Sequence, residues 1–572
     1  ENVIIQSIGA SSGVIVAGAI FTLPALYILQ ESYPQEITVT FAQVFISSLL
    51  GGVLGILFLI PFRKYFVSDM HGKYPFPEAT ATTQVLVSGE KGGSQAKPLL
   101  TAGIIGGLYD FIVATFGWWN ENFTTRVCGF GEMLAEKAKL VFKVNTGAAV
   151  LGLGYIVGLK YASIICAGSL AVWWIIIPGM SLIWGDSVLN QWNPEITATV
   201  GAMSPEEIFK YYAKSIGIGG IAMAGIIGII KSWGIIKSAV GLAAKEMGGK
   251  ADAETNVKRT QRDLSMKIIA IGSIVTLILV TLFFYFDVMQ GNLMHTVVAI
   301  LLVAGISFLF TTVAANAIAI VGTNPVSGMT LMTLILASVV MVAVGLKGPG
   351  GMVAALVMGG VVCTALSMAG GFITDLKIGY WLGSTPVKQE TWKFLGTIVS
   401  AATVGGVMII LNKTYGFTSG QLAAPQANAM AAVIDPLMNG VGAPWLLYGI
   451  GAALALVLTF CKVPALAFAL GMFIPLELNL PLLVGGAINW YVTSRSKDEA
   501  VNNARGEKGT LLASGFIAGG ALMGVVSAIM RYCNINLIHE EWLANPMSEL
   551  VSLVAYLLLI TYLVKASMKL KK

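Results

Sequence analysis

The sequence predicts an all-α polytopic membrane protein made of two inverted-topology repeats. Of its 572 residues, 56% are hydrophobic and 11% are charged, and the mean hydropathy is +0.80, whereas globular domains carry roughly 25% charged residues. Apolar runs of about 18 residues or more, the length that crosses a bilayer, recur along the chain. The runs are continuous and so differ from the alternating ten-residue strands of membrane β-barrels. Similar short segments in the two halves indicate the repeats.

Twelve apolar segments have the length of one full crossing. Two longer apolar regions, 146–183 and 463–495, each contain an internal break, which we expect at Lys160 and Tyr161 in the first and at Asn479–Pro481 in the second. We expect each region to form a helical hairpin that enters and leaves the membrane on the same side. The twelve predicted spans are 11–29, 38–62, 98–118, 212–235, 266–286, 295–320, 328–345, 351–374, 393–412, 442–460, 510–531 and 548–566.

The loops between the spans predict the orientation in the membrane. One set of alternate loops holds 20 Lys and Arg residues and the other set holds 7, and the richer side is cytoplasmic in most membrane proteins. This predicts a cytoplasmic C-terminus. Loop 119–145 is an exception, with four basic residues on the poorer side, and we interpret it as an amphipathic helix at the interface. The richer loops are 62–97, 236–264, 376–393, 496–508 and 567–572.

Other functional classes lack their signatures. The net charge of +6 comes from the loop residues, so nucleic-acid binding is not expected. The five cysteines are scattered, and we interpret them as buried thiols rather than metal ligands or disulfides. There is no Walker A or HExxH motif and no convincing catalytic constellation. We therefore expect no enzyme activity, no metal site and no cofactor.

Four pairs of similar segments suggest an internal duplication. They occur in the same order in the two halves, and the two predicted hairpins follow the same order. We therefore predict a first repeat over 1–290 and a second over 291–572. The pairs are PEATATTQV (77–85) with PQANAMAAV (425–433), AGAIFT (17–22) with AGGFIT (369–374), GGV (51–53) with GGV (405–407), and GSLAVWW (168–174) with GGAINWY (485–491).

Loop charge suggests that the repeats are inverted. The basic cytoplasmic linker 236–264 corresponds to loop 532–547, which has no Lys or Arg, so equivalent loops lie on opposite sides. Inverted repeats are typical of secondary transporters. The second repeat begins with two spans, 295–320 and 328–345, whose counterparts would precede residue 11. We therefore expect the first repeat to lack its first two spans in this chain.

Helix breakers and membrane carboxylates are the candidate site residues. Proline interrupts a helix, and freed backbone groups survive in a membrane only where protein or water satisfies them. For Asn324 in GTNPVSGMT (322–330), a tight cytoplasmic turn is the alternative. His71 is interpreted as a solvated loop histidine. The predicted helix-break residues are Pro75, Pro77, Pro325, Pro425 and Pro475.

Acidic residues in apolar surroundings are the candidates for proton coupling. Ionisable groups inside a membrane are costly and usually functional, and burial favours the neutral, proton-carrying form of a carboxyl group. Glu78, Glu477 and Asp110 fit this description. Asp375 and Lys377 could pair with each other near a helix end, but for these two residues snorkelling is the favoured interpretation. For Glu78, Glu477 and Asp110, snorkelling at the interface is the alternative.

Five long motifs resemble the oligopeptide transporter (OPT) family, in its prokaryotic branch, which is related to yellow-stripe-like metal-chelate transporters. The resemblance covers essentially the whole chain and implies a proton-coupled, multi-pass importer of the cytoplasmic (inner) membrane with about sixteen segments. It also favours a homodimer, and it implies small peptides or metal chelates as substrates. The motifs are KYPFPEATATTQVL, GTNPVSGMT, DLKIGYWLGSTPVKQE, LAAPQANAM and VPALAFALGMFIPLELNLPLLVGGAI.

Together these observations predict a symporter that imports small oligopeptides by alternating access, with the proton as coupling ion and the lipid bilayer as its surroundings. Glu78 and Glu477, then Asp110, are the proton-coupling candidates. An importer of metal chelates, siderophore-like or nicotianamine-like, is the alternative. A channel is less favoured, since its filter would be a ring supplied by several subunits. The predicted substrate-binding residues are Tyr74, Glu78, Asn324, Gln426 and Asn428.

Overall fold

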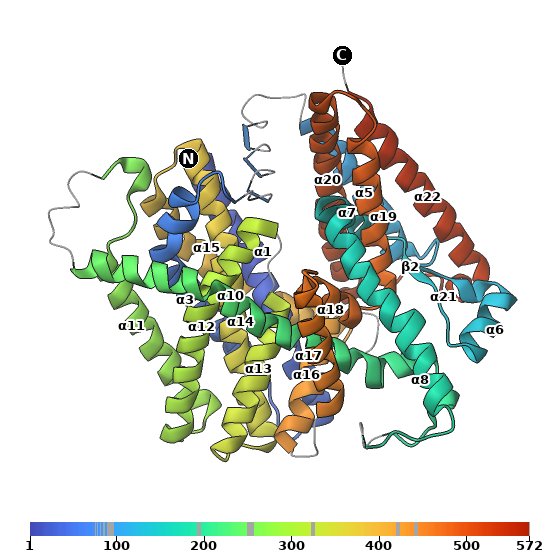
Figure 1. Cartoon of the computed structure of the whole chain (residues 1–572), viewed down its shortest axis with the longest axis horizontal. Helices are drawn as coiled ribbons and strands as arrows, with labels where there is room; N and C mark the ends of the chain where they lie inside the picture. The colour runs from blue at the N-terminus through green and yellow to red at the C-terminus, as the bar shows by residue number, and fades with distance from the viewer. Residues whose placement is uncertain are drawn as a thin grey trace. The chain divides into compact units, whose positions relative to one another are not determined.

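The computed structural model is almost entirely helical (Figure 1). In the part of the chain that it describes, ten helices are long and apolar enough to cross a membrane. The predicted all-α polytopic class is therefore confirmed. The described residues are 1–74, 76, 78–79, 82–83, 86–87, 96–191, 196–248, 257–321, 326–418, 424–439 and 444–570.

Helix occupies each of the twelve predicted crossings. The segment 11–29 is divided by a turn at residues 21–23, so that two helices replace the single one expected. Polar residues begin several helices, and Thr40 illustrates how. Its hydroxyl accepts a hydrogen bond from Gln43 N at 3.2 Å, and Gln43 Oε1 accepts one from Thr40 N at 3.4 Å. This capping box satisfies backbone donors at the start of a helix.

The chain forms two compact units. Unit 1 comprises Glu1–Leu86 and Gly225–Ala443, and unit 2 comprises Val87–Ala224 and Pro444–Lys572. Each unit therefore contains segments of both predicted repeats, 1–290 and 291–572, which remain a prediction. The predicted linker 236–264 begins as helix, because α10 (Lys214–Gly248) starts in unit 2 and continues into unit 1.

Unit 1 is built around α14, whose residues from Gly351 to Gly379 are almost all buried. Helices α3, α1, α12 and α13 pack against it. Gly51 and Gly55 of α3 lie so close to α14 that a Cβ at either position would overlap a backbone carbonyl oxygen. Such small residues let membrane helices approach closely. The helices of unit 1 are α1 (Asn2–Ile20), α2 (Pro24–Ser32), α3 (Phe41–Arg63), η1 (Lys64–Asp69), η8 (Arg259–Gln261), α11 (Met266–Phe283), η9 (Phe284–Val288), α12 (Leu293–Val321), α13 (Val326–Ala343), α14 (Gly348–Leu382), α15 (Pro386–Thr414) and α16 (Pro425–Asn439).

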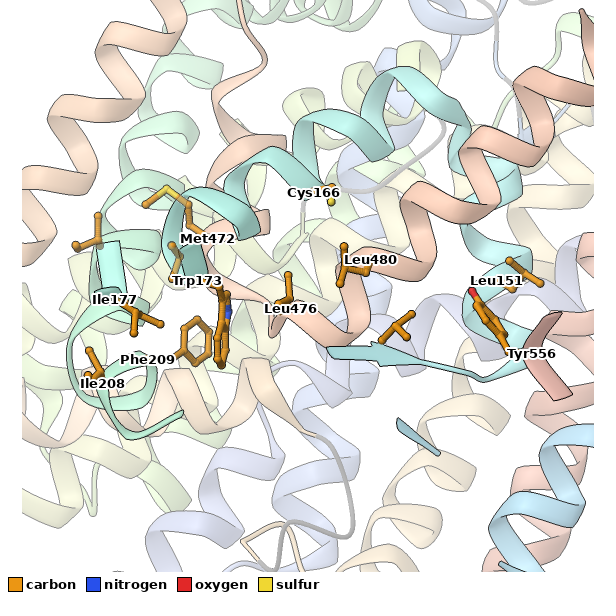
Figure 2. Packing of buried hydrophobic residues seen from close by; sticks show 14 of the residues in the cluster. Leu151, Cys166, Trp173, Ile177, Ile208, Phe209, Met472, Leu476, Leu480 and Tyr556 are labelled. Carbon is orange, nitrogen blue, oxygen red and sulfur yellow. The ribbon is translucent and has the colours of Figure 1, made fainter. Parts of the chain in front are cut away.

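Unit 2 contains the discontinuous helices and a large apolar core (Figure 2). In that core the rings of Trp173 and Phe209 stack with centroids 4.9 Å apart. The elements of unit 2, besides the start of α10, are α5 (Ala96–Phe111), η2 (Ile112–Phe116), β1 (Asn122–Thr124), η3 (Thr125–Val127), α6 (Gly129–Lys137), β2 (Lys143–Asn145), α7 (Ala148–Leu170), η4 (Ala171–Ile176), α8 (Ile177–Trp184), η5 (Val200–Ala202), α9 (Pro205–Ile208), η6 (Phe209–Ala213), α17 (Trp445–Phe460), α18 (Ala465–Phe473), α19 (Leu476–Thr493), α20 (Glu499–Tyr532), α21 (Glu540–Leu543) and α22 (Pro546–Met568).

Both long apolar regions contain a helix break, but neither lies where the hairpin break was expected; the second lies at Pro475, one of the predicted helix-break residues. The first is at Gly158, where φ is 78° and ψ is 163°, and not at Lys160 and Tyr161. A positive φ suits glycine, which has no Cβ. The second is the extended pair Ile474 and Pro475, between α18 and α19. The predicted break at Asn479–Pro481 is wrong, because these residues lie inside α19.

The two broken helices satisfy each other's backbone. Pro475 has no N–H to donate to the Gly471 carbonyl four residues earlier. Instead Ser169 Oγ, from α7, donates to Gly471 O at 2.7 Å. In return Asn489 of α19 donates to the carbonyl of Tyr155 in α7 at 2.8 Å, next to the break at Gly158. Each break therefore receives a hydrogen bond from a side chain of the other helix. At the second break Asn479 of α19 itself also donates to Gly471 O and to Ile474 O, both at 3.1 Å.

The contacts that α7 makes with the helices α18 and α19 are mirrored. Pro475 follows Gly158 by 317 positions (475 − 158), and the same spacing separates GSLAVWW from GGAINWY. Several glycines contact the opposite helix so closely that a Cβ would overlap its backbone, and four of them form two pairs of contacts related by this spacing. A two-fold axis between inverted repeats requires this pattern, although the duplication itself stays a prediction. The contacts are Gly154 with Leu482, Gly471 with Ile165, Gly168 with Phe468, and Gly485 with Leu151.

Loop 119–145 is not the amphipathic helix that we expected. Strands β1 and β2 pair antiparallel in it, and only α6 is an α-helix of any length. Two of its four basic residues are engaged within the protein, since Arg126 and Lys143 both form ion pairs with Glu206. Burial alone would raise the pKa of Glu206, but hydrogen bonding and attraction from Lys143, then Arg126, lower it overall. These two ion pairs therefore join the loop to α9.

Candidate functional site

The segment that follows α3 and η1 is held in place by aromatic residues. Phe76 is buried, and its N–H donates to the carbonyl of Ala319 in α12 at 2.9 Å. Its φ of 43° is unusual for a residue with a Cβ. The ring of Tyr74, a predicted substrate-binding residue, lies between Phe66 and Phe76, with centroids 6.1 and 6.4 Å away. The described part of KYPFPE is therefore anchored to unit 1 and is not a loose loop.

Asp375 and Lys377 of α14 do not pair with each other, so that hypothesis was wrong. Residues two positions apart on a helix point to different sides. Asp375 forms a buried ion pair with Lys393 of α15, with Oδ2 and Nζ 2.6 Å apart. Gln6 Nε2 donates to the other carboxylate oxygen at 2.9 Å. Lys393 also donates to Ser7 O at 2.8 Å, so this pair joins α1, α14 and α15.

Lys377 instead points towards the segment after η1. Its ammonium group donates to the Val67 carbonyl at 2.8 Å and lies 3.0 Å from Nδ1 of His71. Three rings surround it, with Nζ 5.3 Å from the centroid of Phe76, 4.9 Å from Tyr380 and 5.3 Å from Trp381. His71, interpreted from the sequence as a solvated loop residue, is indeed exposed but covers this lysine.

Glu78 belongs to the same unit and lies outside the helices long enough to span a membrane. The residue is exposed, yet its carboxyl group lies among many protein atoms. This burial and, second, the negative charge of Asp375 raise the pKa of Glu78 to about 7. A carboxyl group with this pKa gains and loses a proton near neutral pH, so it can carry one.

The other predicted residues of this site are only partly described. Asn428 lies in α16 and donates to Ala424 O at 3.0 Å. Pro425 is the first residue of α16, where a proline is well tolerated. Gln426 is also in α16, but its side chain is outside the described part. Asn324, Pro325, Pro75 and Pro77 likewise lie outside the described residues.

The two remaining proton-coupling candidates are in unit 2. Asp110 accepts hydrogen bonds from the backbone N–H groups of Ala148 and Ala149, at 2.8 and 3.2 Å. It therefore caps the N-terminus of α7 from another helix. Glu477 is a half-buried residue in the first turn of α19, and its buried Oε2 atom has no hydrogen-bond partner in the described structure. Pro475 lies at the break just before it.

Sequence reasoning missed Lys393 as the partner of Asp375 and His71 as the partner of Lys377. The spacing of 18 residues between Asp375 and Lys393 becomes meaningful only once α14 and α15 fold back on each other. Within the described residues, no group of three His, Cys, Asp or Glu side chains is arranged to hold a metal ion.

Comparison with known proteins gives the family. The pattern of the family described as "OPT oligopeptide transporter protein" matches residues 1–531. A protein of Haemophilus influenzae named "Putative oligopeptide transporter" is 25% identical over an alignment 577 positions long, which covers 93% of this chain and 87% of that protein. The motifs KYPFPEATATTQVL and GTNPVSGMT lie within the matched region. The chain therefore belongs to the OPT family of membrane transporters.

Proposed function

We propose that this protein is a proton-coupled symporter that imports small oligopeptides by alternating access, with Glu78 as the group that carries the proton. The observation that carries this proposal is the position of Glu78. It lies between α3 and α5, close to the negative charge of Asp375, and its pKa is raised to about 7. The name of the Haemophilus influenzae relative supports peptides as the substrate.

The raised pKa sets the direction of the pH dependence. Below about pH 7 Glu78 is mostly protonated and neutral, and above it the carboxylate is mostly charged. A more acidic outside would therefore load the proton, and a more alkaline cytoplasm would release it. Charge and substrate occupancy then bias which side of the membrane the site faces.

The mirrored packing of the broken helices supports alternating access. In transporters with inverted repeats, the two access states arise when the repeats exchange conformations. The pairs of glycine contacts between α7 and α18–α19 give the two repeats equivalent surfaces in unit 2. Equivalent surfaces allow the exchange to occur without loss of close packing.

Uptake into proteoliposomes tests the proposal. With an acidic outside, the wild-type protein should accumulate labelled di- to tetrapeptides, and a protonophore should abolish accumulation. The initial rate should fall as the outside pH rises from 6 to 8, with a midpoint near 7. Glu78→Gln cannot titrate, so we expect at least a tenfold loss of accumulation and a flat pH profile. Exchange of peptide between the two sides without a gradient should survive.

Glu477→Gln is the matched control. Accumulation that depended on the pH gradient in Glu78→Gln but not in Glu477→Gln would move the coupling role to Glu477. A gradient dependence that survived in both variants would overturn the coupling assignment, and Asp110→Asn would then be tested. Accumulation of metal chelates but not of peptides would favour the alternative substrate class. Flux that does not saturate with substrate would indicate a channel.

A further inference from the structure

Lys377 differs from the other buried cations of unit 1. Arg63 pairs with Asp263, and Lys393 pairs with Asp375. Lys377 is just as buried, with 1% of its surface exposed. Among the described residues, however, no carboxylate forms an ion pair with it. Its contacts are the Val67 carbonyl, the His71 ring and three aromatic rings.

A buried cation without a counter-charge is costly. Neutral acceptors and aromatic rings replace part of its lost hydration, but a carboxylate forms shorter and stronger charge-assisted hydrogen bonds. The site is therefore built to hold a positive charge while an anion is absent. This arrangement favours the binding of an anion that comes and goes, as a transported substrate does.

We propose that Lys377 binds the C-terminal carboxylate of the transported peptide. The inference rests on the proposed function and names the substrate group that the site recognises. Every peptide has this carboxylate whatever its sequence, so a single lysine can recognise many peptides. Glu78 lies on the segment that carries Phe76, one of the three rings around Lys377.

The structure indicates how the carboxylate reaches Lys377. His71 is exposed, although the lysine beneath it is buried. We expect the exposed imidazole to move aside when the carboxylate binds. An ammonium group can only donate, so Nδ1 of His71 accepts in this pair and carries no proton. The incoming carboxylate replaces a neutral acceptor with a charged one, and His71 is released towards solvent.

Matched peptides test the proposal. Each peptide is prepared with a free C-terminus and as the C-terminal amide, and binding to the full chain in proteoliposomes is measured by competition with a labelled peptide. We expect the wild type to bind the free acid at least ten times more tightly than the amide. In Lys377→Gln, binding of the acid should weaken to within about twofold of the amide, while binding of the amide stays unchanged.

Two further variants keep the test decisive. Lys388→Gln removes an exposed lysine of α15 and should leave both affinities unchanged. His71→Ala removes the competing acceptor from an exposed position, so it should fold even if Lys377→Gln does not. It should tighten binding of the acid about threefold or more and leave the amide unchanged.

Several outcomes would overturn the proposal. One is equal binding of acid and amide by the wild type. That result would contradict this inference but not the proposed transport of peptides. Another is an equal loss of affinity for the acid and for the amide in folded Lys377→Gln, which would indicate that Lys377 has a purely structural role. A third is no selective gain in His71→Ala. If the wild type binds neither form of any peptide, the proposed function fails and this inference fails with it.

Discussion

At the scale of single residues, Asp110 shows how a membrane carboxylate can be held by backbone. Its two oxygens accept from consecutive N–H groups at the start of α7. These are donors that a helix cannot satisfy by itself, and a negative charge there is favourable. The first expectation for Asp110, a role in proton coupling, stays untested beside this structural role.

Asp110→Asn should therefore destabilise unit 2. The amide keeps the size of the side chain but has one acceptor oxygen and no charge, so we expect a loss of about 0.5–2 kcal/mol, the range for a lost helix cap. The midpoint of thermal unfolding in detergent measures it. Asp186→Asn, an exposed carboxylate in the same unit, is the matched control. Equal midpoints for the two variants would contradict the capping role.

The residue scale also shows where sequence reasoning stops. Acidic residues in apolar surroundings, such as Glu78 and Asp110, are visible in the sequence because charges are rare there. Their partners are not visible. Ala148 lies 38 residues after Asp110, and Lys393 meets Asp375 only because two helices fold back on each other. Such contacts depend on tertiary packing, which hydrophobic periodicity does not encode.

At the scale of elements, the glycines between α7 and α18–α19 determine how closely the helices approach. Gly154 and Gly471 occupy mirrored positions, and a Cβ at either one would overlap a backbone carbonyl oxygen of the opposite helix. Backbone cannot move aside as the end of a flexible side chain can. The two positions should therefore tolerate substitution equally poorly, although they are 317 positions apart.

Gly154→Ala and Gly471→Ala should each lower the unfolding midpoint and the rate of uptake. Overpacking of this kind typically costs about 1–3 kcal/mol. Gly179→Ala in α8 is the control, since a Cβ there meets no atom within 4 Å. Thermal unfolding together with transport in proteoliposomes measures both effects. A variant at 154 or 471 that behaves like Gly179→Ala would show that the helices can separate freely.

The elements also show why the hairpin breaks were misplaced. A break was predicted at Lys160 and Tyr161 because they are polar residues in an apolar run. A break was predicted at Pro481 because prolines disrupt helices. The first break instead has a positive φ at Gly158, and the second has Pro475, which lacks a backbone N–H. Glycines are frequent in this chain, with 66 among 572 residues, so the sequence predicts that a break exists more reliably than it predicts where.

At the scale of the whole molecule, the membrane class follows from composition alone. An apolar fraction of 56% and repeated long apolar runs leave few alternatives. The twelve predicted crossings all contain helix, as expected for long apolar runs. The assignment of those helices to two compact units needed the structure, since each unit draws on both halves of the chain.

The predicted orientation is open to a direct measurement. In a cysteine-free background, a cysteine is placed at Lys497 in a basic loop or at Asp186 in a poorly basic one, both exposed positions. The positive-inside rule predicts that a membrane-impermeant maleimide labels the Asp186 position in intact cells and the Lys497 position only after permeabilisation. The reverse pattern would invert the orientation, and with it the direction of import.

The mirrored glycines have a consequence for ancestry. If the two halves descend from one gene, the ancestral chain was about one repeat long and carried a single copy of each glycine. Two copies of that chain would have met antiparallel across the membrane, each glycine against the backbone of the other copy, as in any self-complementary two-fold interface. Gene fusion then allowed the copies to diverge, so that one helix now breaks at a glycine and its counterpart at a proline.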